Sequence, residues 1–211
     1  MPSIATKSRI KEAAIACFNR VGTANVRLQQ IADEAGMSLG NMTYHFRTRE
    51  DILLSVWEQL VAEQRTLLNA FRVLPLFEDI ERLLDSTFSL QQRYAFFYRD
   101  TPEVMRVCPA VEPEHRQHIR WQVQQLQLAL EFNRARGAFD DNLLTLQQPE
   151  AVATLFWATA DTWLYRCKIT GDDETHYPAF QTILWNVLLP YFSDTGRREF
   201  RQLQNSQLPE V

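Results

Sequence analysis

The stretch that decides the fold runs from Ile31 to Phe46 and reads IADEAGMSLGNMTYHF. Its apolar residues fall at helical spacing on both sides of the short segment Ala35–Ser38. Gly36 can adopt the left-handed backbone that a tight corner between two helices needs, and Ser38 stands where its side chain can cap the second helix. The spacing therefore predicts two short helices joined by a helix–turn–helix corner.

The second of these helices has an inward and an outward side. Met42 and Phe46 anchor it inward, and the outward residues include hydrogen-bond donors but no carboxylate. Such a face suits phosphates and base edges in a DNA major groove. The same spacing also fits an ordinary capped surface helix, so spacing alone leaves both interpretations open. The outward residues are Leu39, Gly40, Asn41, Thr43, Tyr44 and His45, flanked by the donors Arg27, Gln29, Arg47 and Arg49.

The net charge of the whole chain hides an asymmetry. Its 22 basic and 26 acidic residues give a net charge of −4, which by itself speaks against a nucleic-acid partner. Residues 1–50, however, hold seven basic and four acidic side chains, a net charge of +3, and the remainder carries −7. A basic end on an acidic body indicates a polyanionic partner at that end only.

Outside this segment, hydrophobic spacing is helical almost throughout. A first helix ends at Gly22, a long one opens at Thr48, and Pro75 breaks the chain before further helices. The 6 glycines and 9 prolines are too few for a protein built of many hairpins. We therefore expect an all-α fold of about nine helices, with a frayed tail after Ser193. Residues 1–50 are expected to form a helix–turn–helix head, and residues 51–211 a helical body.

Many separated positions of the decisive segment match one family. Ile31–Phe46, followed by RTREDIL at Arg47–Leu53, closely resembles the DNA-binding domain of the TetR family of bacterial transcriptional regulators. The resemblance covers residues 5–55, and the rest of the chain agrees only in length and helical pattern. The matching residues are Ile31-Ala32, Ala35-Gly36-Met37-Ser38, Gly40, Tyr44-His45-Phe46, and the basic residue before Glu50 with the aliphatic pair after it.

The resemblance implies a homodimer whose two third helices enter successive major grooves of a near-palindromic operator, about 34–36 Å apart. It also implies that Gly40 lets the backbone approach the phosphates. Many family members carry a second tyrosine at the position of Thr43. The shorter threonine either does not reach that far or instead touches a thymine methyl group. The residues that the resemblance places at the DNA are Arg27, Gln29, Gly40, Asn41, Thr43, Tyr44, His45 and Arg49.

By the same resemblance, the body holds a small-molecule effector between its middle helices. These helices are rich in aromatic residues, which is typical of a largely apolar pocket with a few placed polar groups. The candidate effector contacts are Phe88, Tyr98, Arg99, Trp121, Gln125 and Asp161. Ordinary core packing is the alternative for each of them. Asp161 stands within an apolar run, so it either bonds a ligand or partner subunit, or is a solvent-facing or internally paired carboxylate.

The resemblance also implies that the last two helices form the dimer interface, here Pro149–Thr170 and Tyr177–Phe192. Their large apolar residues exceed what one buried face requires, as those of a subunit interface do. The alternative is that all of them pack within one chain. The candidate interface residues are Leu155, Trp163, Phe180, Leu184 and Leu188.

Signals for other chemistry are weak. Glu114, His115 and His118 share a helix but lack the spacing of a zinc site, and no nucleophile elbow, P-loop or dinucleotide-binding motif occurs. We therefore expect no enzyme, no metal and no cofactor. The most apolar stretch, Val152–Leu164, is far shorter than the ~20 residues that span a bilayer. Three widely separated cysteines fit a reduced, cytoplasmic protein.

The leading hypothesis is a ligand-responsive transcriptional regulator, a repressor as in most of the family that it resembles. Its effector would shift the population away from the DNA-bound state. The runner-up is an all-α enzyme or small-molecule-binding protein that has lost DNA binding. An adaptor that binds other proteins would need an apolar stripe on the third helix, where only Leu39 is available.

Overall fold

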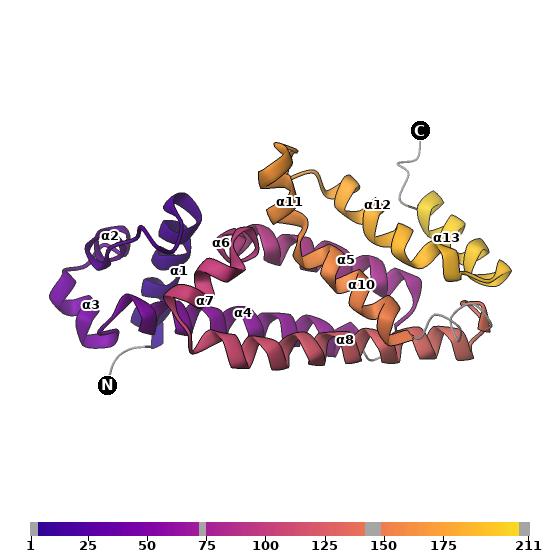
Figure 1. The fold of residues 1–211 in the computed structure, drawn as a ribbon, viewed down its shortest axis with the longest axis horizontal. Coiled ribbons are helices and arrows are strands. Elements are labelled where there is room, and N and C mark those ends of the chain that lie inside the picture. Colours follow the sequence, from indigo (N-terminus) through magenta and orange to yellow (C-terminus); the bar gives the residue numbers. More distant parts are fainter. Residues whose placement is uncertain (1–3, 72–74, 142–148, 207–211) are drawn as a thin grey trace. The chain divides into compact units, whose positions relative to one another are not determined.

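The computed structural model describes residues 4–71, 75–141 and 149–206 of the chain. These residues form twelve α-helices, one 3-10 helix and no β-strand, which confirms the all-α prediction (Figure 1). In chain order the elements are α1 (Ile4–Val21), α2 (Leu28–Glu34), α3 (Leu39–His45), α4 (Arg49–Phe71), α5 (Phe77–Arg93), α6 (Ala95–Arg99), α7 (Thr101–Val107), α8 (Val111–Ala135), α10 (Pro149–Asp161), α11 (Trp163–Thr170), α12 (Tyr177–Leu188), η1 (Leu189–Tyr191) and α13 (Asp194–Ser206).

Two compact units divide the chain. The first comprises the residues up to Gln64 together with Leu90–Gln117, and the second comprises Arg65–Ser89 and His118–Val211. The divisions fall inside α4, α5 and α8, whereas the expected boundary at residue 50 lies where α4 has just begun. Helical spacing does not change along a helix that belongs to both units, so the sequence pattern carries no sign of such a division.

The inward faces of α1 to α4 form the core of the first unit. Phe18 of α1, Ile31 of α2, Met42 of α3 and Ile52 of α4 are completely buried. Gly22, with a φ of +79°, ends α1 so that the chain can turn toward α2. This core holds α1, α2 and α3, which we call the head, against the start of α4.

Hydrogen bonds tie α1 to the junction of α5 and α6. The Asn19 side chain accepts the backbone N–H of Phe96 at 2.8 Å and donates to the carbonyl of Arg93 at 2.9 Å. The Arg93 guanidinium bridges Glu12 of α1, at 2.5 Å, and Glu63 of α4, at 3.0 Å. The head is therefore linked to α4, α5 and α6 by polar contacts between residues far apart in the sequence.

Close packing holds α13 in the second unit. The rings of Trp185 in α12 and Phe200 in α13 lie 4.8 Å apart between centroids. A Cβ atom on Gly196 would lie 2.1 Å from the Ala138 carbonyl oxygen, which shows how closely the two segments approach. The expectation that the tail frays after Ser193 is therefore wrong, because the chain continues there as a docked helix.

The expected helix over Pro149–Thr170 is two helices, α10 and α11, with a break at Thr162. The Thr162 hydroxyl donates to the carbonyl of Ala158 at 2.7 Å. A threonine that bonds back to the preceding turn favours bending of a helix. Breaks of this kind are one reason why the described helices outnumber the nine expected.

Candidate nucleic-acid interface

The predicted helix–turn–helix corner is present between α2 and α3. Gly36 has a φ of +62°, and the N–H of Met37 donates to the carbonyl of Ala32 at 3.0 Å. The Ser38 hydroxyl accepts the N–H of Asn41 at 3.2 Å and so caps α3. The turn residues thus do what their sequence positions predict, and they fix the direction in which α3 leaves the corner.

α3 is anchored on one side and exposed on the other. Met42 and Phe46 are buried, whereas Gly40 and Asn41 are exposed and Tyr44 keeps 74% of its surface in solvent. No carboxylate lies on α3 itself. The exposed face therefore offers hydroxyl, amide and ring groups that the protein's own core does not use.

Two other side chains of α3, Thr43 and His45, already make contacts within the helix. Thr43 donates its hydroxyl to the carbonyl of Gly40 at 3.1 Å, which leaves its oxygen able to accept a further bond. His45 is half-buried, its ring meets that of Tyr44 edge-on at 5.4 Å, and its Nδ1 has no partner among the described residues. Both side chains are partly exposed, although the Nδ1 atom of His45 is itself buried.

Gly40 is not explained by packing within the chain. Its backbone is helical, and an added Cβ would meet no atom within 4 Å. A glycine inside a helix costs about 0.5–1 kcal/mol relative to alanine. Since no neighbour in the described chain excludes a larger residue there, the cause of the glycine has to be sought outside the chain.

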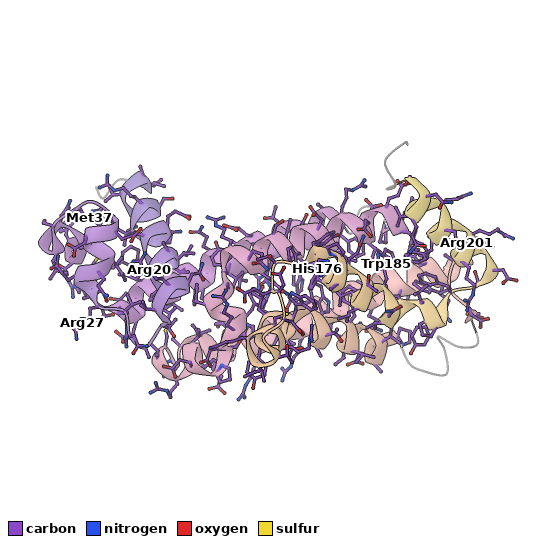
Figure 2. All side chains as sticks on the ribbon, turned by 90° about the horizontal axis from the view of Figure 1, so that it is seen from above. Arg20, Arg27, Met37, His176, Trp185 and Arg201 are labelled. Atoms are coloured by element: carbon purple, nitrogen blue, oxygen red, sulfur yellow. The ribbon has the colours of Figure 1, made fainter. Side chains whose placement is uncertain are left out.

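Two candidate contacts lie on or beside α2. Arg27 is exposed at the N-cap position, where its backbone N–H donates to the Gln30 side chain at 2.8 Å, and Figure 2 shows its side chain projecting from the head. Gln29 is exposed and donates to Asp33 at 2.7 Å. These two residues and the α3 face are thus brought together on the head.

Arg49 does not join this face, in contrast to the expectation. Its Nη1 donates to the carbonyls of Ala24 at 2.7 Å, Thr23 at 3.3 Å and Val26 at 3.4 Å, and its Nη2 pairs with Glu50 at 3.2 Å. The guanidinium is therefore turned into the loop between α1 and α2. The physical reason is that this loop presents several carbonyls together, and a planar guanidinium can bond more than one of them.

Arg47, which the sequence suggests only as a flanking donor, is better placed than Arg49 to contact DNA. Arg47 is exposed and has no hydrogen bond or ion pair in the part of the chain that the structure describes. Thr48 and Asp51 next to it exchange reciprocal side-chain to backbone bonds of 3.0 Å, which fix the start of α4. The guanidinium of Arg47, unlike that of Arg49, is therefore free of bonds to the described part of the chain.

The candidate effector residues fall in both units. Tyr98 and Arg99 belong to the first, where Tyr98 accepts a bond from Gln64 at 2.7 Å and Arg99 lies 3.5 Å from the carbonyl of Asn19. The other four belong to the second unit.

Within the second unit, two of these four residues are packed against rings. Phe88 contacts Tyr177 and Phe180, each at 5.3 Å between centroids. Trp121 is partly exposed and stacks on His118 at 5.7 Å. Phe88 is therefore packed in the core of the second unit.

The two polar candidates of the second unit, Gln125 and Asp161, differ from Phe88 and Trp121, which pack against rings. Gln125 is buried, and its Oε1 has no partner among the described residues. Burial raises the pKa of Asp161 to about 7. Sequence reasoning missed Gln122, which is also buried and has an unpaired Nε2. Its position three residues before Gln125 was a signal, because two amides then share one face of α8.

Four of the five candidate interface residues are core residues of the second unit. Trp163, Phe180, Leu184 and Leu188 are buried within the chain, while Leu155 is 54% exposed. Within the chain α12 is surrounded by α10, α5 and α13, which accounts for the burial of these four residues.

The histidines of α8 do not form a metal centre. Burial lowers the pKa of His115 to about 4, and its ring meets Phe97 at 5.1 Å. Across the described ranges, no group of three His, Cys, Asp or Glu side chains is placed to hold a metal ion. None of the described helices combines the length and apolar character needed to cross a bilayer.

Known proteins share both the sequence and the fold. The model of the bacterial regulatory proteins of the tetR family matches residues 10–56, and that of the TetR bacterial transcriptional repressors matches residues 58–200, more than half of the chain. The HTH-type transcriptional regulator RutR of Escherichia coli strain K12 is 37% identical over 68 residues. This match covers 32% of the present chain and 32% of RutR, so it spans about a third of that relative.

Solved structures extend the likeness over nearly the whole chain. A TetR-family regulator from Marinobacter aquaeolei VT8 has a TM-score of 0.77 at 20% identity, over 96% of this chain and 98% of that one. SmeT, the repressor of the Stenotrophomonas maltophilia multidrug efflux pump SmeDEF, has a TM-score of 0.66 at 18% identity, over 89% and 91%. The likenesses show the fold, and the two family models show that the chain belongs to the TetR family of bacterial transcriptional regulators.

Proposed function

We propose that this regulator binds a near-palindromic operator as a homodimer and represses transcription until a small-molecule effector in its helical body releases it. The observation that carries the proposal is the outward face of α3, which is anchored by buried Met42 and Phe46 and presents donors without a carboxylate. Such a helix can lie in a major groove, where its side chains contact phosphates and base edges. With DNA as its partner, the protein acts in the cytoplasm.

The proposed set of DNA contacts differs at one position from the set expected from the sequence. Arg47 takes the place of Arg49, because its guanidinium is exposed and unbonded in the described chain. Gly40 is explained if the backbone of α3 approaches a phosphate more closely than a Cβ would allow. The full set is Arg27, Gln29, Gly40, Asn41, Thr43, Tyr44, His45 and Arg47.

Selection of bound fragments from a genomic DNA pool tests this function. The native chain is expected to enrich a short palindromic sequence, and the double variant Tyr44→Ala, His45→Ala is expected to enrich none. Arg198→Ala is a matched control, since this exposed residue of α13 lies in the second unit. Equal enrichment by the native chain and the double variant would refute the proposal.

For the dimer we propose the exposed side of α10 and α11. Leu155 of α10 and Tyr165 and Ile169 of α11 are each more than half exposed, and Tyr165 and Ile169, four residues apart, lie on one side of α11. Exposed apolar residues gathered in this way mark interaction surfaces. They replace the four buried residues as the proposed interface.

Sedimentation velocity tests this interface. Leu155→Glu together with Tyr165→Glu is expected to give a monomer, because burying two charges between subunits is unfavourable. Leu128→Glu on α8, also an exposed apolar position, is the control and should remain dimeric. A double variant that sediments as a dimer would contradict the assignment of this face.

A further inference from the structure

Two buried amide groups on α8 are left without partners. Gln122 and Gln125 lie three residues apart on the same helix and are both buried. The Gln122 Nε2 and the Gln125 Oε1 form no hydrogen bond with the described part of the chain. An unsatisfied buried polar group is costly, and native proteins hold few of them. One donor and one acceptor are thus available on one face of α8.

Helix α10 brings a carboxyl group to the same part of the second unit. The indole Nε1 of Trp157 donates to the backbone carbonyl of Gln122 at 3.1 Å, which joins α10 to α8 at the level of the two amides. Asp161 follows Trp157 by four residues, so it lies one turn further along the same side of α10. All four residues belong to the second unit.

Asp161 has no partner of its own. Within the described residues it forms no side-chain hydrogen bond and no ion pair, and burial alone raises its pKa to about 7. Ionising a carboxyl group in such surroundings costs free energy, and a nearby cation would offset that cost. This answers the question that the sequence left open, because the carboxylate is neither internally paired nor fully in solvent.

We propose that the second unit binds an amine-bearing effector on an apolar or aromatic frame, with Asp161 as the counter-ion and Gln122 and Gln125 as hydrogen-bond partners. The inference rests on the proposed function, since it names the effector class of the regulator. A protonated amine gives the carboxylate a charge-assisted bond, which is about twice as strong as a neutral one.

The same arrangement disfavours an anionic effector. A ligand carboxylate would bring a second negative charge to a partly buried carboxyl group that already lacks a counter-charge. The chain beyond residue 50 carries a net charge of −7, and this charge adds an electrostatic field that attracts cations and repels anions. Fatty acids and other apolar acids are therefore expected to be poor ligands.

Three probes with one frame test the proposal on the full-length protein: phenethylamine, phenethyl alcohol and phenylpropionate. Isothermal titration calorimetry is expected to show that the amine binds at least about tenfold more tightly than the alcohol and that the acid does not bind. Asp161→Asn keeps the size of the side chain and removes a charge from partly buried surroundings, so it should fold. It is expected to weaken amine binding about tenfold and to leave alcohol binding unchanged.

The outcomes separate the effector class from the proposed function. Equal binding of amine and alcohol, preferred binding of the acid, absence of amine binding, or an unchanged amine affinity in Asp161→Asn would each overturn the effector class. Gln125→Leu provides a second variant, in which the affinity for amine is expected to fall while the chain remains folded. Operator binding is measured separately with native protein, so a failure to bind DNA would overturn the proposed function and leave the calorimetric result to decide the ligand class.

Discussion

Replacing Arg49 by alanine should loosen the head while leaving its DNA-binding face intact. The guanidinium donates to the Ala24 carbonyl at 2.7 Å, while its bonds to Thr23 and Val26 are long, at 3.3 and 3.4 Å. A hydrogen bond from a charged donor contributes about 1.5–3 kcal/mol, and two long bonds sharing one nitrogen add little. The Arg49 side chain is 25% exposed, so a value in the lower half of that range applies, about 2 kcal/mol.

Two measurements together identify the role of this side chain. For a chain of this size, a destabilisation of about 2 kcal/mol lowers the melting temperature by about 4–8 °C. Operator affinity should fall by the same factor at every salt concentration, since the Arg49 guanidinium binds no phosphate. Arg49→Lys keeps the charge but cannot bond several carbonyls at once, so it should still lose about half of the stability that alanine loses.

Arg47→Ala is the matched comparison, because its guanidinium is exposed and unbonded in the described chain. It should leave the melting temperature unchanged and reduce the slope of log affinity against log salt by about 0.9 for each phosphate that Arg47 neutralises. The reasoning is refuted if Arg49→Ala melts like the native protein and reduces the salt slope instead, since the side chain would then leave the loop and bind a phosphate.

Three further outcomes follow from the structure. Tyr44→Ala should weaken operator binding and leave the melting temperature unchanged, because the side chain is 74% exposed; a matching loss of stability would contradict this. Asp161→Asn should raise the free energy of unfolding at pH 8 by up to about 4 kcal/mol, because the native carboxyl, with its pKa raised from 3.8 to about 7, is ionised at a cost there. This gain should shrink as the pH falls from 7 to 4, and denaturant titrations showing a constant gain would refute it. Gly196→Ala should destabilise α13 by about 1–3 kcal/mol because its Cβ would lie 2.1 Å from the Ala138 carbonyl oxygen, whereas Gly40→Ala, which meets no atom, should not; equal melting temperatures of the two variants would disprove the close packing.

The corner from Ile31 to Phe46 could be predicted because its determinants are local. The turn glycine, the cap residue Ser38 and the inward Met42 all act within a few residues of one another, and the structure places each as expected. The exposed face of α3 follows from the same periodicity. The exposed positions of a short helix, which are its candidate DNA contacts, can therefore be predicted from the sequence when the anchoring residues recur at helical spacing.

The position of the Arg49 guanidinium could not be predicted from the sequence, because its determinants are not local. Its acceptors are backbone carbonyls of the loop at Thr23, Ala24 and Val26, more than twenty residues earlier, and backbone carbonyls leave no trace in residue identity. A basic residue at the start of a helix fits a phosphate contact and an internal bond equally well. Only the path of the loop decides between them.

The sequence by itself determined the all-helical fold, the helix–turn–helix corner and the basic head on an acidic body, since these depend on spacing and charge along the chain. The tertiary structure decided which side of each apolar helix is covered. Phe180 and Leu184 are buried by helices of their own unit, while Leu155 is exposed. It also left Asp161, Gln122 and Gln125 with polar atoms that no described residue bonds. Burial and hydrogen-bond pairing depend on which distant parts of the chain pack against a residue. Hydrophobic periodicity predicts that one face of a helix is covered, but not which element covers it.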